Sequence, residues 1–365
     1  MAQNHHTSTA AGQCATAEPV AARSHNPSCY DTTPLGEAEP EFRLLELLPG
    51  TRGEEVRGKL AAAKIAASAQ QFKALSYAWG SDSKSCSILI VPPVGTHVEP
   101  TAVAITESLH TALVHLRDVH QPVRLWIDQI CINQDNRVEK GAQVRLMGSI
   151  YAQAEQVIVW LGPAADGSDS LMDAWNVVGQ AAGDWGLEGY YTRERWPELH
   201  RMMNTPDPSD PKHAEFTALL QTAADTLIPL ITANVLKHWF DRSWFARAWI
   251  VQEFCLCPNT AFICGTKTLP AELAMLAIHL LRYAMSQLFS QFHAAVPTDL
   301  IRETSNEPAS RLFSCRQRRR KLDRGDSGAT GDQLHALLVK LYVDRDTQAS
   351  LHRDRVFSLL SLIHI

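Results

Sequence analysis

The sequence predicts an α/β fold in which helices flank a parallel β-sheet. The main observation is the segment from residue 125 to residue 163, in which an apolar run, a polar turn, a stretch of helical periodicity and a second apolar run follow one another. Strands joined through a helix usually run parallel in one sheet, so this segment predicts a parallel crossover unit. Other short apolar runs end at glycine or proline, which favours strands.

The first elements are expected after an N-terminal tail. Residues 1–40 lack periodicity and hold no aromatic residue apart from Tyr30, so they predict a disordered tail. Gly80 follows one of the apolar runs and permits a sharp turn. Three strands are expected, at residues 42–48, 73–77 and 87–91.

A helix and the crossover unit come next. Leucines at positions 109, 113 and 116 recur at helical spacing, and Thr106 with Glu107 offers a cap. The run that begins at Leu125 predicts a buried strand, residues 139–151 predict a helix, and residues 156–161 predict a second strand closed by Gly162 and Pro163.

The second half of the chain is expected to be mainly helical. Residues 163–240 predict a helical insertion on the α/β core, interrupted by three prolines between residues 205 and 211. A long amphipathic helix is expected at residues 272–292. Residues 301–333 are polar and predict a mobile, basic loop that includes the run Arg316–Lys321. This run could be a nuclear address or a contact with an anionic surface, or simply part of a solvated loop.

Composition limits the classes of protein. The 365 residues are 45% hydrophobic and 20% charged, as in ordinary globular proteins, and the net charge of −5 argues against a general nucleic-acid binder. Eight cysteines without a Cys-x-x-Cys pair predict free thiols in the cytoplasm, and the Cys255, Cys257 and Cys264 spacing is poor for zinc, so no metal is expected. No secretory signal is visible, and charges interrupt residues 273–289, so no membrane segment is expected.

Polar side chains at the ends of the predicted strands are the candidate site. Asp128 and Asn133 follow the strand of Leu125, and ligands bind at strand ends in open α/β sheets. Ser76 and Tyr77 lie at the end of another predicted strand and Trp79 follows it, so these three could line the same site. The alternatives are ordinary turn hydrogen bonds for the first pair, and buried hydrogen bonds and aromatic packing for the others.

Three blocks of the sequence resemble the signature of the fungal heterokaryon incompatibility (HET) domain. They are Phe72–Gly80, Leu125–Gly162 and Trp244–Glu253, in the order of that family. A weaker fourth block, Asp354–Leu362, carries Ser361 where glycine is usual. The resemblance implies a HET domain at residues 41–300, and a C-terminal part at 334–365 that ends inside a matched block, as a truncated product would.

The HET family has been likened to TIR domains, which implies a TIR-like or flavodoxin-like sheet and an enzymatic site. The block that contains Trp249 and Glu253 is similar to the TIR segment whose glutamate is needed to split NAD. By that resemblance Glu253 is the catalytic carboxylate, with Asp128 in support, because a carboxylate stabilises an oxocarbenium-like sugar. Arg247 would grip a phosphate. The alternative is that Glu253 pairs with Arg247 or Arg242 and only fixes the local structure.

The resemblance implies an intracellular role in non-self recognition that ends in programmed cell death. One hypothesis is an NAD glycohydrolase, with NAD as substrate and no bound cofactor. A second is a non-catalytic signalling module that self-associates or recruits other incompatibility proteins. A third is an inactive, truncated product. No membrane partner and no specific nucleic acid are expected.

Overall fold

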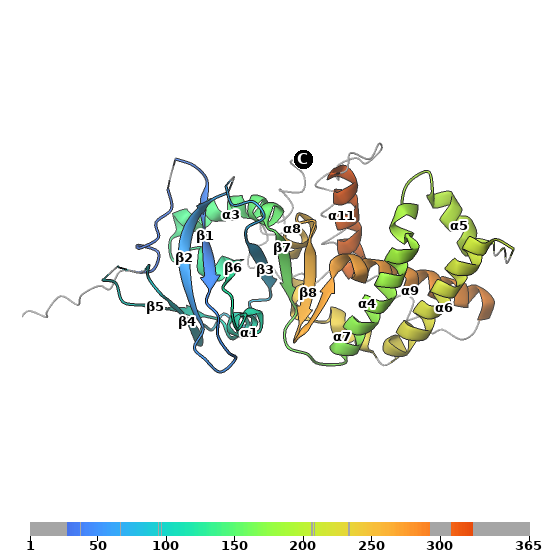
Figure 1. Ribbon diagram of the computed structural model, residues 1–365, viewed down its shortest axis with the longest axis horizontal. Helices are drawn as coiled ribbons and strands as arrows, with labels where there is room; N and C mark the ends of the chain where they lie inside the picture. Colours follow the sequence, from blue (N-terminus) through green and yellow to red (C-terminus); the bar gives the residue numbers. More distant parts are fainter. Residues whose placement is uncertain are drawn as a thin grey trace, which may run out of the picture.

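The computed structural model describes residues 28–292, except 37, 66, 94, 96, 206, 208 and 233, together with residues 308–323. The strands in this part of the chain form one nine-stranded sheet in the order β5-β4-β2-β1-β6-β3-β7-β8-β9 (Figure 1). The strands are β1 (Glu41–Leu47), β2 (Arg57–Lys64), β3 (Lys73–Tyr77), β4 (Cys86–Ile90), β5 (Thr101–Ile105), β6 (Val123–Trp126), β7 (Gln156–Trp160), β8 (Thr260–Cys264) and β9 (Lys267–Pro270).

The fold is α/β as predicted, but the sheet is mixed and not parallel throughout. Its four neighbouring strands β6, β3, β7 and β8 run parallel. On one side β1 is antiparallel to both β6 and β2, and on the other β9 is antiparallel to β8. Strands joined by short connections pair antiparallel, which explains β1 with β2 and β8 with β9. The predicted parallel pairing is therefore found from β6 to β8 and between β2 and β4, while the other neighbouring strands pair antiparallel.

The predicted crossover unit is confirmed between β6 and β7. A one-turn helix α2 (Asp128–Cys131) follows β6, and α3 (Arg137–Gln153) leads to β7. The side-chain oxygen of Asn136 caps α3 by accepting hydrogen bonds from the amides of Val138 and Glu139, each 3.1 Å long. Strand β3 lies between β6 and β7 in the sheet, so the connection passes over it.

The expected cap and turn in the first half also have the predicted geometry. Helix α1 (Glu107–Leu116) begins after Thr106, whose hydroxyl oxygen accepts a hydrogen bond from the amide of Leu109 at 3.3 Å. Gly80 has a φ of 72°, a left-handed conformation that glycine adopts without strain.

Helices of the second half pack beside the sheet. They are α4 (Ser168–Trp185), α5 (Trp196–Asn204), α6 (Pro211–Thr232), α7 (Val235–Phe240) and α9 (Ala271–Phe292), with a 3-10 turn η1 (Leu187–Tyr190). In Figure 1, α4, α5, α6 and α9 fill the half of the molecule opposite β1 and β2. Helices α4 and α9 approach closely at Gly179, where an added Cβ would lie 2.3 Å from the carbonyl oxygen of Leu273.

Part of the predicted mobile loop is a helix. Residues 308–323 form α11 (Pro308–Asp323), which packs against α8 (Ile250–Cys255). The basic run that suggested a solvated loop begins at Arg316, which is buried and bonded to backbone carbonyls and to Glu272. The ion pair and hydrogen bonds of Arg316 therefore stabilise a helix in a segment whose polar composition predicted a loop. Residues 301–307 and 324–333 of that loop, and the expected C-terminal part 334–365, lie outside the described residues.

The structure describes only the last part of the predicted N-terminal tail. Residues 1–27 lie outside it, whereas residues 28–36 are placed against the domain with Cys29 buried.

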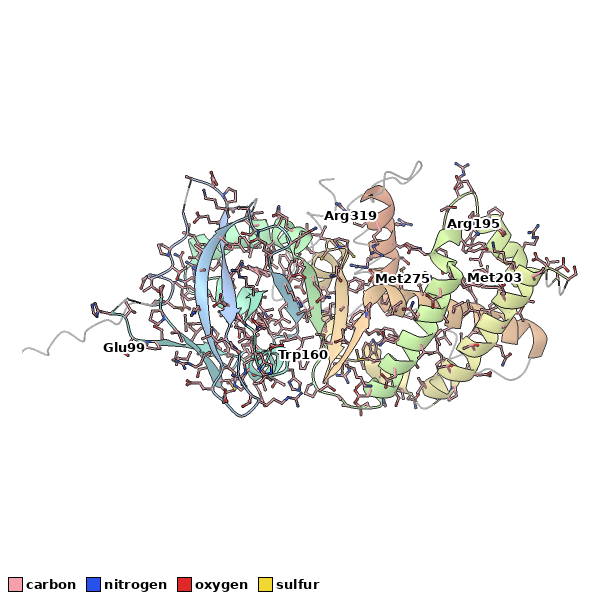
Figure 2. The ribbon with its side chains drawn as sticks, in the orientation of Figure 1. Glu99, Trp160, Arg195, Met203, Met275 and Arg319 are labelled. Atoms are coloured by element: carbon pink, nitrogen blue, oxygen red, sulfur yellow. The ribbon has the colours of Figure 1, made fainter. Side chains whose placement is uncertain are left out.

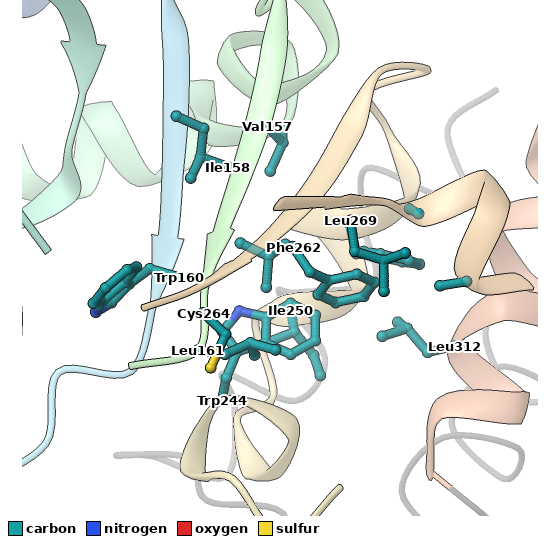
Figure 3. Packing of buried hydrophobic residues seen from close by; sticks show 14 of the residues in the cluster. Val157, Ile158, Trp160, Leu161, Trp244, Ile250, Phe262, Cys264, Leu269 and Leu312 are labelled. Atoms are coloured by element: carbon teal, nitrogen blue, oxygen red, sulfur yellow. The ribbon is translucent and has the colours of Figure 1, made fainter. Parts of the chain in front are cut away.

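One hydrophobic cluster joins the sheet and the helices. It runs from Cys29 to Cys315 and includes both faces of the central strands. Figure 3 shows Trp244, Ile250 and Phe262 within it, and the rings of Trp244 and Phe262 meet edge to face at 5.9 Å. In Figure 2, Glu99 and Arg195 lie near opposite ends of the molecule. Across the described ranges, the helices are too short or too polar to span a bilayer.

Candidate functional site

The candidate site lies where two parallel strands end side by side. Ser76 is near the end of β3, and Asp128 comes directly after the neighbouring β6. A third segment reaches the same place, because the 3-10 turn η2 (Ser243–Ala246) and helix α8 bring Arg247 and Glu253 to them. The carboxyl ends of parallel strands are the usual ligand-binding edge of an α/β sheet.

Glu253 is the most buried charge of this cluster. Its side chain is 1% exposed, and both carboxylate oxygens accept hydrogen bonds from Arg247, at 2.9 and 3.0 Å. The hydroxyl of Ser76 also donates to the Glu253 carboxylate. Ser76 in turn accepts a 2.7 Å hydrogen bond from the indole nitrogen of Trp244. This bidentate pair is the strongest geometry for a guanidinium and a carboxylate.

The pairing of Arg247 with Glu253 is possible because the third block is not one continuous helix. Arg247 follows η2 in an extended conformation, and α8 begins only at Ile250. Six residues apart on one helix, the two side chains would point to different faces. The chain bends between them, so the predicted pair forms. The alternative partner, Arg242, donates instead to the carbonyl of Leu161 at 2.8 Å.

Asp128 forms the more accessible part of the cluster. Its carboxylate accepts hydrogen bonds from the indole nitrogen of Trp79 at 3.0 Å and from the amide of Gln129 at 2.7 Å. Both Asp128 and Trp79 are partly exposed, as is Arg247, whereas Ser76 is buried. A ligand would therefore meet Asp128, Trp79 and Arg247 before it met Glu253.

The electrostatics of the cluster set Asp128 apart. Its pKa is raised to about 6, because burial and the nearby carboxylate of Glu253 raise it by more than Arg247 and the hydrogen bond from Trp79 lower it. Burial lowers the pKa of Arg247, but the carboxylates of Glu253 and Asp128 raise this pKa by more, so the net shift is upward. Asp128 can therefore exchange a proton near neutral pH.

Two tyrosines surround these charges. Burial raises the pKa of Tyr77, and so does Asp128. Burial raises the pKa of Tyr151 too, as do Glu253 and Asp128. The Tyr151 hydroxyl donates to the carbonyl of Leu75 at 3.3 Å, while the hydroxyl of Tyr77 is buried near Asp128. Tyr151 could not be predicted as a site neighbour, because in the sequence it belongs to the apolar face of α3.

Two of the candidate residues lie apart from this network. The amide of Asn133 donates to Glu139 at 2.8 Å, and its side chain accepts from the amide of Asp135 at 3.2 Å, as the turn alternative expects. Trp249 is the residue before α8. Its carbonyl accepts hydrogen bonds from the amides of Gln252 and Glu253, at 3.1 and 3.3 Å. The partly buried ring of Trp249 packs against the core. In the described ranges, no three His, Cys, Asp or Glu side chains are grouped to hold a metal.

Comparison with known proteins identifies the family of this chain. The family model described as heterokaryon incompatibility protein (HET) matches residues 72–253, a range that begins before Ser76 and ends at Glu253. The chain belongs to the heterokaryon incompatibility (HET) family. The matched range contains the three convergent segments and therefore the whole cluster.

A curated relative extends the similarity beyond the HET domain. Over 340 residues the chain is 32% identical to "Heterokaryon incompatibility protein 6, OR allele" of Neurospora crassa, a match that covers 91% of this chain and 49% of the relative. The HET chain thus spans about half the length of that relative. No solved structure matches this HET chain.

Proposed function

We propose that this HET-family chain acts in fungal heterokaryon incompatibility, a non-self recognition response that ends in cell death. The family match and the name of the Neurospora crassa relative support this role. Expression of the chain in a fungal host, followed by measurement of cell viability, tests it. Normal viability at full expression would count against it.

For the chemistry of the site, we propose that the cluster hydrolyses NAD at the bond between nicotinamide and ribose. One observation carries the proposal. Three separate sequence blocks meet at the ligand-binding edge of the sheet, where Glu253 shares hydrogen bonds with Ser76 and Arg247. The carboxylate of Asp128 lies close enough to interact electrostatically with both Arg247 and Glu253. A packing role alone would not require two carboxylates around one guanidinium.

The reaction needs few protein groups. The bond from ribose to nicotinamide breaks with its electron pair leaving on nicotinamide, which departs neutral, and positive charge develops on the ribose. The carboxylate of Glu253 stabilises that charge. A water oxygen then bonds to the ribose carbon, and its proton passes to Asp128 and on to solvent. Arg247, the partly exposed cation of the cluster, binds a phosphate of NAD.

The test is the amount of NAD against time with purified full-length protein, alone and under enforced clustering. Glu253→Gln keeps the shape of the side chain and removes its charge. The matched control is Glu46→Gln, because Glu46 forms only a surface pair with Lys59 at 3.6 Å. We expect wild type and E46Q to consume NAD at equal rates. The rate of NAD consumption by E253Q should be lower by a factor of about 100 or more. Equal turnover by E253Q and wild type would refute the proposed role of Glu253.

A second candidate function is a non-catalytic signalling module. The observation that favours it is the full occupation of Glu253, whose two oxygens already accept hydrogen bonds from Arg247 and Ser76. In this case the cluster stabilises a surface through which the chain self-associates. Cell death would then follow oligomeric state while NAD stays constant. Size-exclusion chromatography of Arg282→Glu, on the exposed side of α9, beside viability and NAD measurements separates the two functions.

A further inference from the structure

The N-terminal strap, defined here as residues 28–36, packs against the turn that carries Asp128. Its Cys29 is 4% exposed, and the hydroxyl of Tyr30 donates to the carbonyl of Ile130 at 3.1 Å. Local hydrogen bonds shape the strap, since the amide of Ser28 donates to Asp31 at 2.9 Å and the hydroxyl of Thr32 donates to the carbonyl of Cys29, also at 2.9 Å. The strap is therefore a folded part of the domain.

Helix α2 depends on donors from outside because it is a single turn. The last carbonyls of any helix have no partner within the helix, and in a one-turn helix this includes nearly all of them. Three carbonyls of α2 accept side-chain hydrogen bonds. That of Asp128 accepts from Gln134 at 2.7 Å, that of Ile130 from Tyr30, and that of Cys131 from Arg43 at 3.3 Å.

Arg43 joins the strap to this turn. Its side chain is 1% exposed, and its Nε donates to the carbonyl of Thr33 in the strap at 2.7 Å. Its other nitrogens bind Glu139 of α3 at 2.6 and 3.2 Å. The guanidinium also lies 5.0 Å from the ring centroid of Tyr30. One buried cation thus connects β1, the strap, α2 and α3.

We propose that Tyr30 and Arg43 are positioning residues for Asp128: by holding the carbonyls of α2 from the strap side, they fix the turn that presents this carboxylate to Trp79. Gln129 holds the other side of the turn, where its side-chain oxygen accepts a 2.9 Å hydrogen bond from the amide of Thr106. The effect on NAD turnover rests on the proposed function, whereas the position of the Asp128 carboxylate does not.

The test follows the ionisation of Asp128 through its hydrogen-bond donor. The indole nitrogen of Trp79 bonds the Asp128 carboxylate, so its NMR signal in protein labelled with ¹⁵N-tryptophan reports protonation as pH changes. Trp79→Phe identifies the signal. The charged groups that act on Asp128 are Arg247 and Glu253. The titratable side chains of Tyr77, Tyr151 and Cys131 also interact with it, and none of these groups is altered.

Tyr30→Phe removes one hydrogen bond to α2 and keeps the ring. We expect the titration midpoint of the Trp79 signal to fall by roughly half a pH unit or more, because a looser turn lets water reach Asp128 and reduces the effect of burial. The matched control is Tyr191→Phe, which removes a 2.9 Å hydrogen bond to His279 among the helices. Its midpoint should equal that of wild type.

Arg43→Lys provides a second variant, since it keeps the charge but loses the bidentate contact with Glu139. It should lower the midpoint as Tyr30→Phe does. The proposal would be overturned if both variants have native spectra and the same titration midpoint of the Trp79 signal as wild type. If Arg43→Lys does not fold, the midpoint of Tyr30→Phe alone decides. A lowered midpoint in a protein that consumes no NAD would uphold the positioning role and remove the proposed reaction.

Discussion

At the scale of single residues, the cluster places two carboxylates around one guanidinium. Arg247 is bonded in a bidentate manner to Glu253, so its charge is largely compensated there. Asp128 receives hydrogen bonds from Trp79 and Gln129 but no ion-pair contact within 4.0 Å among the described residues. Burial and the second carboxylate therefore make Asp128 the group that most readily takes up a proton.

This arrangement predicts that Asp128→Asn changes the pH dependence of stability. The folded pKa of about 6 lies above the ordinary value of 3.8, so the folded state holds the proton more tightly and wild-type stability falls as pH rises from about 4 to about 6. Asparagine cannot ionise, so the variant should gain up to about 3 kcal/mol relative to wild type between pH 4 and pH 7. Urea unfolding at both pH values measures this. A difference independent of pH would contradict it.

The pair of Arg247 with Glu253 predicts strong energetic coupling. Glu253→Met leaves a guanidinium without its partner and should cost roughly 3–5 kcal/mol, as should Arg247→Met. The double variant should cost much less than the two single costs added together, because no uncompensated charge remains. Chemical denaturation of the four proteins gives the coupling free energy. Additive costs would show that the pair is not a unit.

The sequence could predict the members of this site better than its geometry. Asp128 follows one apolar run and Ser76 lies near the end of another, so strand-end placement brings them to one edge. Asn133 also follows an apolar run but serves the turn before α3, because a chain that has just left a strand can direct its side chains either way. The approach of Arg247 to Glu253 needs a bend between η2 and α8 that periodicity does not reveal.

At the scale of elements, β1, β3, β4, β6 and β7 were predicted from apolar runs, whereas β2, β5, β8 and β9 were not, although β8 is also largely apolar. Residues 73–77 match β3 as predicted. Strand β2 contains three consecutive alanines, which favour helix by propensity, and it forms because it pairs with β1 from Gly58 to Lys64 and with β4 at its start. Helix α11 has the composition of a loop, and its stability comes from contacts with α8 that lie far away in sequence.

Helix α11 should depend on Arg316. This side chain is 2% exposed and binds Glu272 at 2.8 Å and the carbonyls of Cys257 and Pro258 at 2.8 and 2.7 Å. Arg316→Met would remove the shortest hydrogen bonds to these acceptors, which keep only longer ones from Arg320 and Thr260. It should cost roughly 3–5 kcal/mol and the amide protection of α11. Hydrogen exchange detects this. Arg320→Met is the control, since Arg320 is 23% exposed and should lose far less. Equal losses would contradict the role of Arg316.

The contact of α4 with α9 predicts opposite effects for two glycines of one helix. In Gly179→Ala the new Cβ meets the backbone of Leu273 at 2.3 Å, so the helices must separate at a cost of about 1–3 kcal/mol. In Gly183→Ala, one turn further on, the Cβ has an ordinary 3.7 Å contact with Leu276, and alanine should stabilise α4 by up to about 1 kcal/mol. Thermal unfolding of both variants tests the pair. Destabilisation by Gly183→Ala would mean that the gap is smaller than described.

At the scale of the whole molecule, the sheet and the helices share one core. The hydrophobic cluster is continuous from the strands near the site to α4, α6 and α9. Polar contacts bridge the same boundary, since Lys267 of β9 pairs with Asp173 of α4 at 2.7 Å and Asn176 donates to the carbonyl of Thr268 at 3.1 Å. The helical region from residue 163 to residue 240 is thus a layer of the domain in the described part of the chain.

A shared core predicts that damage at the helices is transmitted to the site. If sheet and helices unfold together, Gly179→Ala should lower the free energy of opening by the same amount for the slowest amides of β3 and of α9. Native-state hydrogen exchange at increasing urea, followed by mass spectrometry of peptides from both elements, gives the two values. Gly141→Ala is a suitable control, because nothing lies within 4 Å of its added Cβ. A loss confined to α4 and α9 would mean that the helices open alone, and the site on the sheet would then be independent of the layer beside it.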